Sequence, residues 1–121
     1  MAADNGQMSF RRGVMSLVIL GLLKKEDMYG YQLVQETERR SGGRIVTQEG
    51  SLYPVLYKLV DQGLISDRKV LVGRRMTRVY YHLEPAGRAY FQKIFAEYMT
   101  VQQGVQEILA SCQKEVTDIE P

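Results

Sequence analysis

The C-terminal third of the chain carries apolar residues in a strict heptad spacing. Steps of three and four residues alternate through Phe91, Ile94, Tyr98, Val101, Val105, Ile108 and Cys112. Because this spacing draws a narrow seam along one side of a helix, it predicts a helix over residues 85–113 that packs its seam against another helix. The acidic residues 114–121 are predicted to be a disordered tail.

The sequence does not by itself determine which helix packs against this seam. The chain has no second heptad segment, so the simplest partner is the same helix in another copy, and we predict a homodimer. Two alternatives remain: packing on the first helix of the same chain, or interleaving of the first and last helices of two subunits. The predicted dimer-interface residues are Val14, Leu17, Phe91, Ile94, Tyr98, Val101, Val105 and Ile108.

Near the N-terminus, two arginines precede an apolar run, as in secretion signals. The run over residues 14–23 is too short to span a membrane, which takes about 20 residues. Charged residues 24–27 follow it where a cleavage site would need small residues. After a disordered tail at 1–8, we expect a core helix over 9–25 and a cytoplasmic protein. Its inward residues are predicted to be Val14, Leu17, Val18 and Leu20, together with the turn at 21–22.

Two further helices are predicted in the middle of the chain. The first begins at residue 27 or 28, ends near Arg40, and faces inward with Gly30, Leu33, Val34 and Thr37. The second covers about 48–62, with an apolar stripe of Leu52, Val55, Leu56, Leu59 and Val60. Ser51, Tyr53 and Lys58 lie off this stripe and are expected to face outward. An alternative for Tyr53 and Tyr57 is packing against the preceding helix or the hairpin described next.

Residues 64–72 and 79–83 are rich in strand-forming residues and predict a β-hairpin. The loop between them, over 73–78, starts with glycine and contains Arg74, Arg75 and Arg78. Three helices followed by such a hairpin is the order of a winged helix-turn-helix, here over residues 9–84 with the wing at about 66–83. The fold class is therefore mainly α with a small β-hairpin, plus a C-terminal dimerisation helix.

The net charge of +2 hides an uneven distribution of charge. Nine Lys or Arg and three acids lie between residues 39 and 78, a net of +6, and the remainder of the chain carries −4. The positive part coincides with the ends of the two middle helices and with the wing. This placement favours a polyanionic partner, double-stranded DNA. The candidate DNA-binding residues are Gln48, Ser51, Tyr53, Lys58, Arg74, Arg75 and Arg78.

Catalysis has little support in the sequence. With one histidine, His82, and one cysteine, Cys112, no catalytic triad and no His/Cys zinc cluster can be assembled. There is no phosphate-binding glycine loop of the G-x-x-x-x-G-K type. We therefore expect no enzyme activity, no cofactor and no metal.

The chain resembles the PadR-like transcriptional regulators in an ordered set of motifs. These are Met28-Tyr29-Gly30-Tyr31-Gln32-Leu33, Gly50-Ser51-Leu52-Tyr53-Pro54-Val55-Leu56, Gly63-Leu64-Ile65, Gly73-Arg74-Arg75 and Tyr80-Tyr81-His82-Leu83 with Gly87. The resemblance implies a homodimeric repressor on an inverted-repeat operator, with the third helix in the major groove and the wing at the minor groove or backbone. It also implies release by a small-molecule effector, whose identity the sequence does not give.

Two other functions fit the same fold. A winged helix can serve as a protein-interaction module, or as a small-molecule sensor, without binding DNA directly. The interaction module does not explain why the +6 stretch lies on the surface expected to contact DNA. The sensor overlaps with a DNA-binding regulator, because the family that the chain resembles couples effector binding to release of DNA. The sequence therefore favours a sequence-specific DNA-binding regulator.

Overall fold

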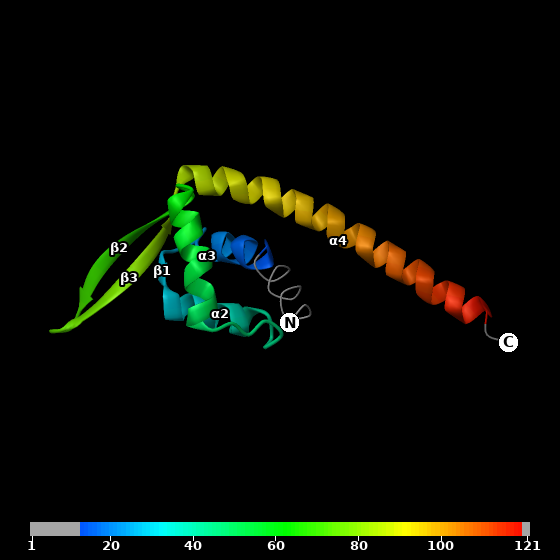
Figure 1. Cartoon of the computed structure of the whole chain (residues 1–121), viewed down its shortest axis with the longest axis horizontal. Coiled ribbons are helices and arrows are strands. Elements are labelled where there is room, and N and C mark those ends of the chain that lie inside the picture. Colours follow the sequence, from blue (N-terminus) through cyan, green and yellow to red (C-terminus); the bar gives the residue numbers. More distant parts are fainter. Residues whose placement is uncertain (1–12, 120–121) are drawn as a thin grey trace. The chain divides into compact units, whose positions relative to one another are not determined.

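The computed structural model describes residues 13–119, with side chains to residue 114. The chain divides into two compact units, one ending at Phe91 and the other beginning at Gln92. The first unit holds the sheet and the shorter helices, and the second is the remainder of the last helix (Figure 1). The predicted tail 1–8 and the predicted helix start at residue 9 lie outside the described residues.

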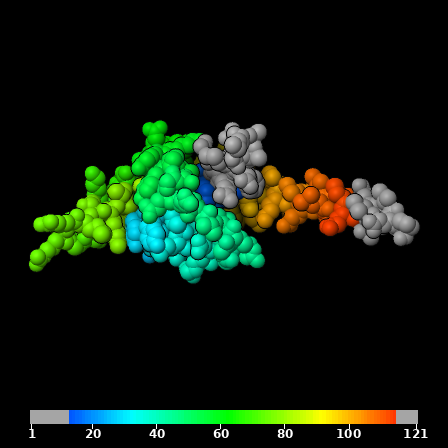
Figure 2. All heavy atoms as spheres, turned by 60° about the horizontal axis from the view of Figure 1, so that its bottom comes forward, coloured from blue at the N-terminus to red at the C-terminus, as the bar shows by residue number. Residues whose placement is uncertain are grey.

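The first unit has the predicted order of helices and hairpin. Residues 13–22 are helical, and they are followed by β1 (Met28–Tyr29), α2 (Gly30–Arg40) and α3 (Glu49–Asp61). Then come β2 (Ile65–Val72), β3 (Met76–Leu83) and α4 (Pro85–Ile119). The sheet is antiparallel in the order β1-β3-β2. Its β2–β3 hairpin, the wing, extends beyond α2 and α3 (Figures 1 and 2).

The core lies where the helices meet one face of the sheet. Every second residue of a strand points to the same face, and on the core face Met28, Ile65, Tyr81 and Leu83 are buried. Four residues of the predicted α3 stripe are also buried, and Val60 is half-buried. The first helix and the turn after it add Met15, Ile19, Leu20, Leu22 and Leu23, α2 adds Leu33, and Leu64 is buried between α3 and β2.

Helices α2 and α3 each end in a glycine that adopts a left-handed conformation. At the end of α3, Gly63 has φ +74°, and its N–H donates to the carbonyl of Val60 while the N–H of Leu64 donates to that of Leu59. Gly42 ends α2 in the same way. This motif satisfies carbonyls that a helix end leaves open. It fixes where each chain segment leaves its helix.

Gly87 allows the start of α4 to lie against the corner between α3 and β2. A Cβ at this position would overlap the carbonyl oxygen of Leu64 and stand 2.8 Å from a methyl carbon of Leu83. The same carbonyl accepts a hydrogen bond of 3.1 Å from the N–H of Glu84. The position therefore requires glycine for a steric reason, because any side chain would push α4 away from this corner.

Three predicted boundaries need correction. Residues 28 and 29 were expected at the start of a helix, but they form β1 and pair with Tyr81 and Tyr80 of β3. The second wing strand begins at Met76 instead of residue 79, because pairing continues to Val72↔Met76 and leaves only 73–75 for the turn. Helix α4 continues to Ile119, so residues 114–119 are helical and not a disordered tail.

The inward face predicted for the first helix was also wrong in part. Leu20 is buried, but Val14, Leu17 and Val18 are half-buried. Leu22 is buried as predicted, and the buried positions that the prediction missed are Met15, Ile19 and Leu23. This helix is apolar on most of its circumference, and periodicity cannot determine the orientation of such a helix.

Candidate nucleic-acid interface

The outer face of α3 is polar and open to solvent. Burial of the Leu52, Leu56 and Leu59 face sets the rotation of this helix. As a result, Ser51 and Lys58 are exposed on the opposite side, as predicted. Gln48 is the N-terminal cap residue and is exposed, and its side chain makes no capping hydrogen bond. These side chains are available to an external partner.

Tyr53 is not available to an external partner in the same way, because it is held by contacts within the fold. Its hydroxyl donates to Oε2 of Glu49 over 3.1 Å, and its ring stacks on Tyr57 with centroids 5.9 Å apart. It also lies against Gly30 of α2, where a Cβ would stand 2.8 Å from the hydroxyl oxygen. Burial, followed by the bond to Glu49, raises the pKa of Tyr53. Of the two readings of the sequence, the one with Tyr53 packed against the preceding helix is correct.

The tip of the wing presents two unpaired arginines. Gly73 has φ +75° and opens the turn, and Arg74 and Arg75 follow it fully in solvent. Leu71 and Met76, which flank them, are 69% and 59% exposed. Among the described side chains, no salt bridge involves either arginine. The predicted basic tip is therefore present and free to bind.

Arg78 and Arg68 are held on the outer face of the sheet, the face turned away from the core. The Arg78 guanidinium lies 4.3 Å from the ring centroid of Tyr29, and that of Arg68 lies 5.5 Å from the centroid of Tyr80. The two tyrosine rings meet edge to face at 5.4 Å. Arg78 was predicted as a DNA contact, and the structure places it half-buried over a tyrosine instead of free at the tip.

Asp27 joins this outer face through an ion pair with Arg68 and a 2.7 Å contact with Nδ1 of His82. Burial raises the pKa of the Asp27 carboxyl, but the bonds from His82 and Arg68 outweigh it, and the net shift is downward. Sequence reasoning missed this cluster. Its members are 41 and 55 residues apart in sequence, and no local pattern indicates such a contact.

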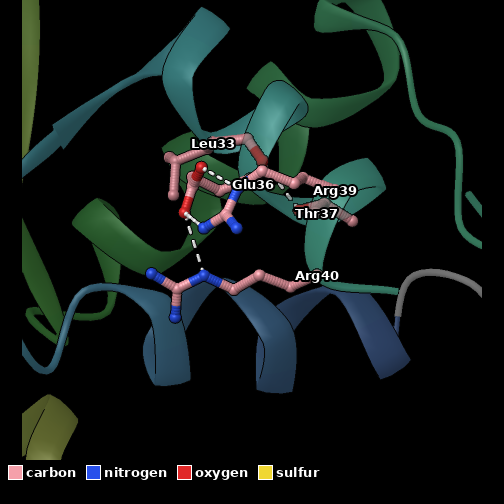
Figure 3. A network of polar contacts seen from close by, with 5 residues as sticks. All are labelled: Leu33, Glu36, Thr37, Arg39 and Arg40. Atoms are coloured by element: carbon pink, nitrogen blue, oxygen red, sulfur yellow. Dashed lines mark hydrogen bonds and ion pairs between the residues drawn. The ribbon is translucent and has the colours of Figure 1, made fainter. Parts of the chain in front are cut away.

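Glu36 holds two more of the counted cations. Its carboxylate accepts hydrogen bonds from Arg39 at 2.8 and 2.9 Å and from Arg40 at 2.9 Å, all within α2 (Figure 3). The bonds from Arg39, then those from Arg40, lower the pKa of Glu36 to about 2. These arginines are less available to DNA than their charge suggests.

The positive stretch is therefore more localised than the sequence indicates. Three of its nine cations pair with Glu36 or Asp27, acids that lie outside residues 39–78. The six that form no salt bridge among the described side chains are Arg44, Lys58, Lys69, Arg74, Arg75 and Arg78. Free positive charge is thereby concentrated on α3, on the loop before it and on the wing.

The predicted dimer residues fall into two groups. Phe91 belongs to the first unit, where its ring lies 3.2 Å from the place a Cβ on Gly21 would take and 5.0 Å below the Lys24 ammonium. Packing on the first helix of the same chain, one of the alternatives, thus holds for Phe91. Ile94 is half-buried. Val14 and Leu17 of the first helix are half-buried as well. Tyr98, Val101, Val105 and Ile108 are exposed, and the neighbouring Phe95, Met99 and Leu109 widen this exposed apolar stripe.

The family of the chain follows from comparison with known proteins. The model of the transcriptional regulator PadR-like family matches residues 19–93, which run from the first helix through the wing and into α4. The chain belongs to the PadR-like family of transcriptional regulators. Membership confirms the predicted winged-helix fold and confirms that the chain is a transcriptional regulator and not an enzyme.

Two relatives, one of them matched both by sequence and by structure, illustrate this PadR-like membership. The negative transcriptional regulator PadR of Bacillus subtilis (strain 168) is 31% identical over 75 residues, covering 62% of this chain and 41% of that protein. The structure of a transcriptional regulator from Clostridium thermocellum has a TM-score of 0.73 at 25% identity, over 82% of this chain and 93% of that one. The crystal structure of B. subtilis PadR in complex with operator DNA has a TM-score of 0.64 at 28% identity.

The alignment with that complex covers 68% of this chain and 47% of the other, so the chain spans about half the length of B. subtilis PadR. The shared part is the size of the winged-helix unit. As for membranes, none of the helices in the described part of the chain has the length and apolar content needed to cross one.

Proposed function

We propose that this PadR-like regulator is a sequence-specific DNA-binding repressor that acts as a homodimer. The observation that carries the proposal is that Ser51 and Lys58 on the outer face of α3 and the arginines of the wing tip are exposed within one compact unit, and that none of them forms a salt bridge among the described side chains. A relative that shares this fold at 28% identity has been crystallised with operator DNA.

In this proposal α3 enters the major groove. Its Ser51 hydroxyl and the Gln48 amide are polar groups that can bond to base edges or phosphates, and Lys58 supplies a positive charge. Tyr53 has a supporting role, because its hydroxyl already bonds to Glu49 and its ring packs against α2 and Tyr57. The groove-facing set is therefore smaller than the sequence suggested.

The wing tip contacts the neighbouring minor groove or backbone. A guanidinium is planar and always charged, so Arg74 and Arg75 suit both a narrow minor groove and a pair of phosphate oxygens. Arg78 contributes positive potential from its place over Tyr29 instead of reaching a base. The acids that remain near this surface are Glu49, Asp61 and Asp67.

Dimerisation through α4 completes the proposal. The stripe with Tyr98, Val101, Val105 and Ile108 is exposed in the single chain. Burying it against a second copy removes apolar surface from water at roughly 25 cal/mol per Å². A two-fold axis then presents two α3 helices to an inverted-repeat operator. Repression, release by a small molecule and a cytoplasmic location remain parts of the proposal, and the name of B. subtilis PadR supports repression for that protein.

Selection from a random DNA library tests this function. Full-length protein would be mixed with random duplexes, and bound duplexes would be recovered and sequenced over several rounds. We expect enrichment of an inverted repeat with half-sites about one helical turn, roughly 10 base pairs, apart. Absence of any enriched motif, with a folded dimer present, would contradict the proposal and favour the protein-interaction function.

A further inference from the structure

The outer face of the wing sheet is tied to the start of the helix-turn-helix at a single carboxylate. Asp27 ion-pairs with Arg68 of β2 and contacts His82 of β3. Its side chain is only 24% exposed, whereas those of its two partners are 54% and 53% exposed. One acidic group therefore connects to both strands of the hairpin.

The place of Asp27 in the chain makes this contact mechanically important. It comes directly before β1 and three residues before Gly30, the first residue of α2. The hairpin is also linked to residues 27–30 by the short pairing of β1 with β3 and by the contact of Tyr29 with Tyr80 and Arg78. The pairing of β1 is only two residues long.

We infer that Asp27 is a positioning residue that holds the wing in register with α2 and α3, and that operator specificity depends on it. The inference rests on the proposed DNA-binding function. A DNA duplex requires the wing tip and the recognition helix to reach adjacent grooves together, so a wing free to pivot must first be ordered before both can bind. Asp27 acts through Arg68 and His82 and touches no DNA itself.

Removing the charge of Asp27 distinguishes a positioning role from a purely electrostatic effect on DNA binding. An acid near a DNA-binding surface repels phosphates, so its removal alone should strengthen binding to any duplex. Loss of positioning should instead weaken binding to the selected operator. The two effects have opposite signs on specific binding.

The test is the substitution Asp27→Asn, with Asp67→Asn as its matched control. Asp67 lies on the same strand as Arg68, is exposed on the opposite face, and forms no salt bridge among the described side chains. Both variants lose one negative charge. Dissociation constants would be measured for the duplex selected by the wild-type protein and for a scrambled duplex of the same length, with folding checked by circular dichroism.

We expect D27N to bind the selected duplex about fivefold or more weakly, within the range of coupling energies between contacting groups. D27N should bind the scrambled duplex as well as wild type or better, and D67N should bind both duplexes as well or better. Tighter binding of D27N to the selected duplex, matching D67N, would overturn the inference. If the wild-type protein selects no duplex, the proposed function fails instead, and the two failures are distinguishable.

A measurement without DNA tests the positioning of the wing directly, and its His82→Ala arm keeps the inference testable even if D27N folds poorly. Spin labels at Arg75→Cys and Asp61→Cys, in a Cys112→Ser background diluted with unlabelled protein, report the distance between the wing tip and the end of α3. The distribution should broaden with D27N, and to a lesser extent with His82→Ala, which removes one partner and leaves the Arg68 pair. It should keep its width with D67N. Unchanged widths in both D27N and His82→Ala would overturn the inference.

Discussion

At the scale of single residues, what a side chain or its absence does is decided by its neighbours. Tyr53 looked like an outward-facing phenol, but its hydroxyl bonds to Glu49 and its ring lies against Gly30. Gly87 appears in the sequence only as part of a family motif, and the structure gives its reason: the carbonyl of Leu64 occupies the space where its Cβ would be. Both examples involve contacts between elements, and both can be tested by substitution.

Replacing Gly87 with alanine should destabilise the protein by about 1–3 kcal/mol or more, because the added Cβ meets a fixed backbone carbonyl instead of a flexible side chain. Urea unfolding at one fixed protein concentration measures this. Gly104→Ala is the control, since nothing lies within 4 Å of its Cβ position. It should stabilise the helix by up to about 1 kcal/mol. Equal effects of the two substitutions would contradict the steric explanation.

Glu36 predicts a pH dependence of stability. Its pKa in the folded state is about 2, below the usual 4.5, so its ionised form stabilises the fold above pH 4.5 and this contribution is lost as the pH falls toward 2. Wild-type protein should therefore lose more thermal stability between pH 5 and pH 3 than Glu36→Gln. Melting temperatures of both proteins at matched ionic strength measure this difference, and parallel curves would show that the arginine contacts add nothing.

At the scale of elements, the spacing of apolar residues predicted the features that residues close in sequence determine. The stripe on α3 is formed by residues within one helix, so its buried face and its polar face could be predicted from the sequence. β1 could not, because it is a strand only through its pairing with β3, more than fifty residues later. The Asp27 cluster was missed for the same reason. The salt bridges of Arg39 and Arg40 with Glu36 are local, and spacing of three and four residues on a helix could have revealed them.

Helix α4 carries the prediction that belongs to this scale. Replacing both Val101 and Ile108 with aspartate should convert the proposed dimer to monomers, because it places charges in the exposed apolar stripe. Light scattering coupled to size exclusion measures the mass. Thr100→Asp with Gln106→Asp adds the same charge at exposed positions off the heptad seam and should leave the dimer intact. A dimer that persists in the Val101 and Ile108 double variant would contradict the prediction that the heptad seam forms the dimer interface.

At the scale of the whole molecule, the net charge of +2 does not show that some cations are paired within the fold and others are available to a partner. Family membership establishes a PadR-like regulator, and the described ion pairs show which cations are free. Arginines held by Glu36 and Asp27 shape helix α2 and the sheet, while Lys58, Arg74 and Arg75 remain available. The sequence placed the positive charge correctly along the chain. It could not show which cations were already paired, because the two acids responsible, Glu36 and Asp27, both lie outside the basic stretch.

The most direct test of DNA binding by this surface is the salt dependence of affinity. Dissociation constants for the selected duplex would be measured from 50 to 300 mM salt for wild type and for Arg74→Ala with Arg75→Ala. If both arginines bind phosphates as proposed, the double variant removes two such contacts from each protomer, and the slope of log K against log salt should become shallower by about 3–4 for the dimer. Lys93→Ala with Lys114→Ala removes the same charge from exposed positions on α4 and should keep the wild-type slope. A wing variant with an unchanged slope and affinity would contradict the account.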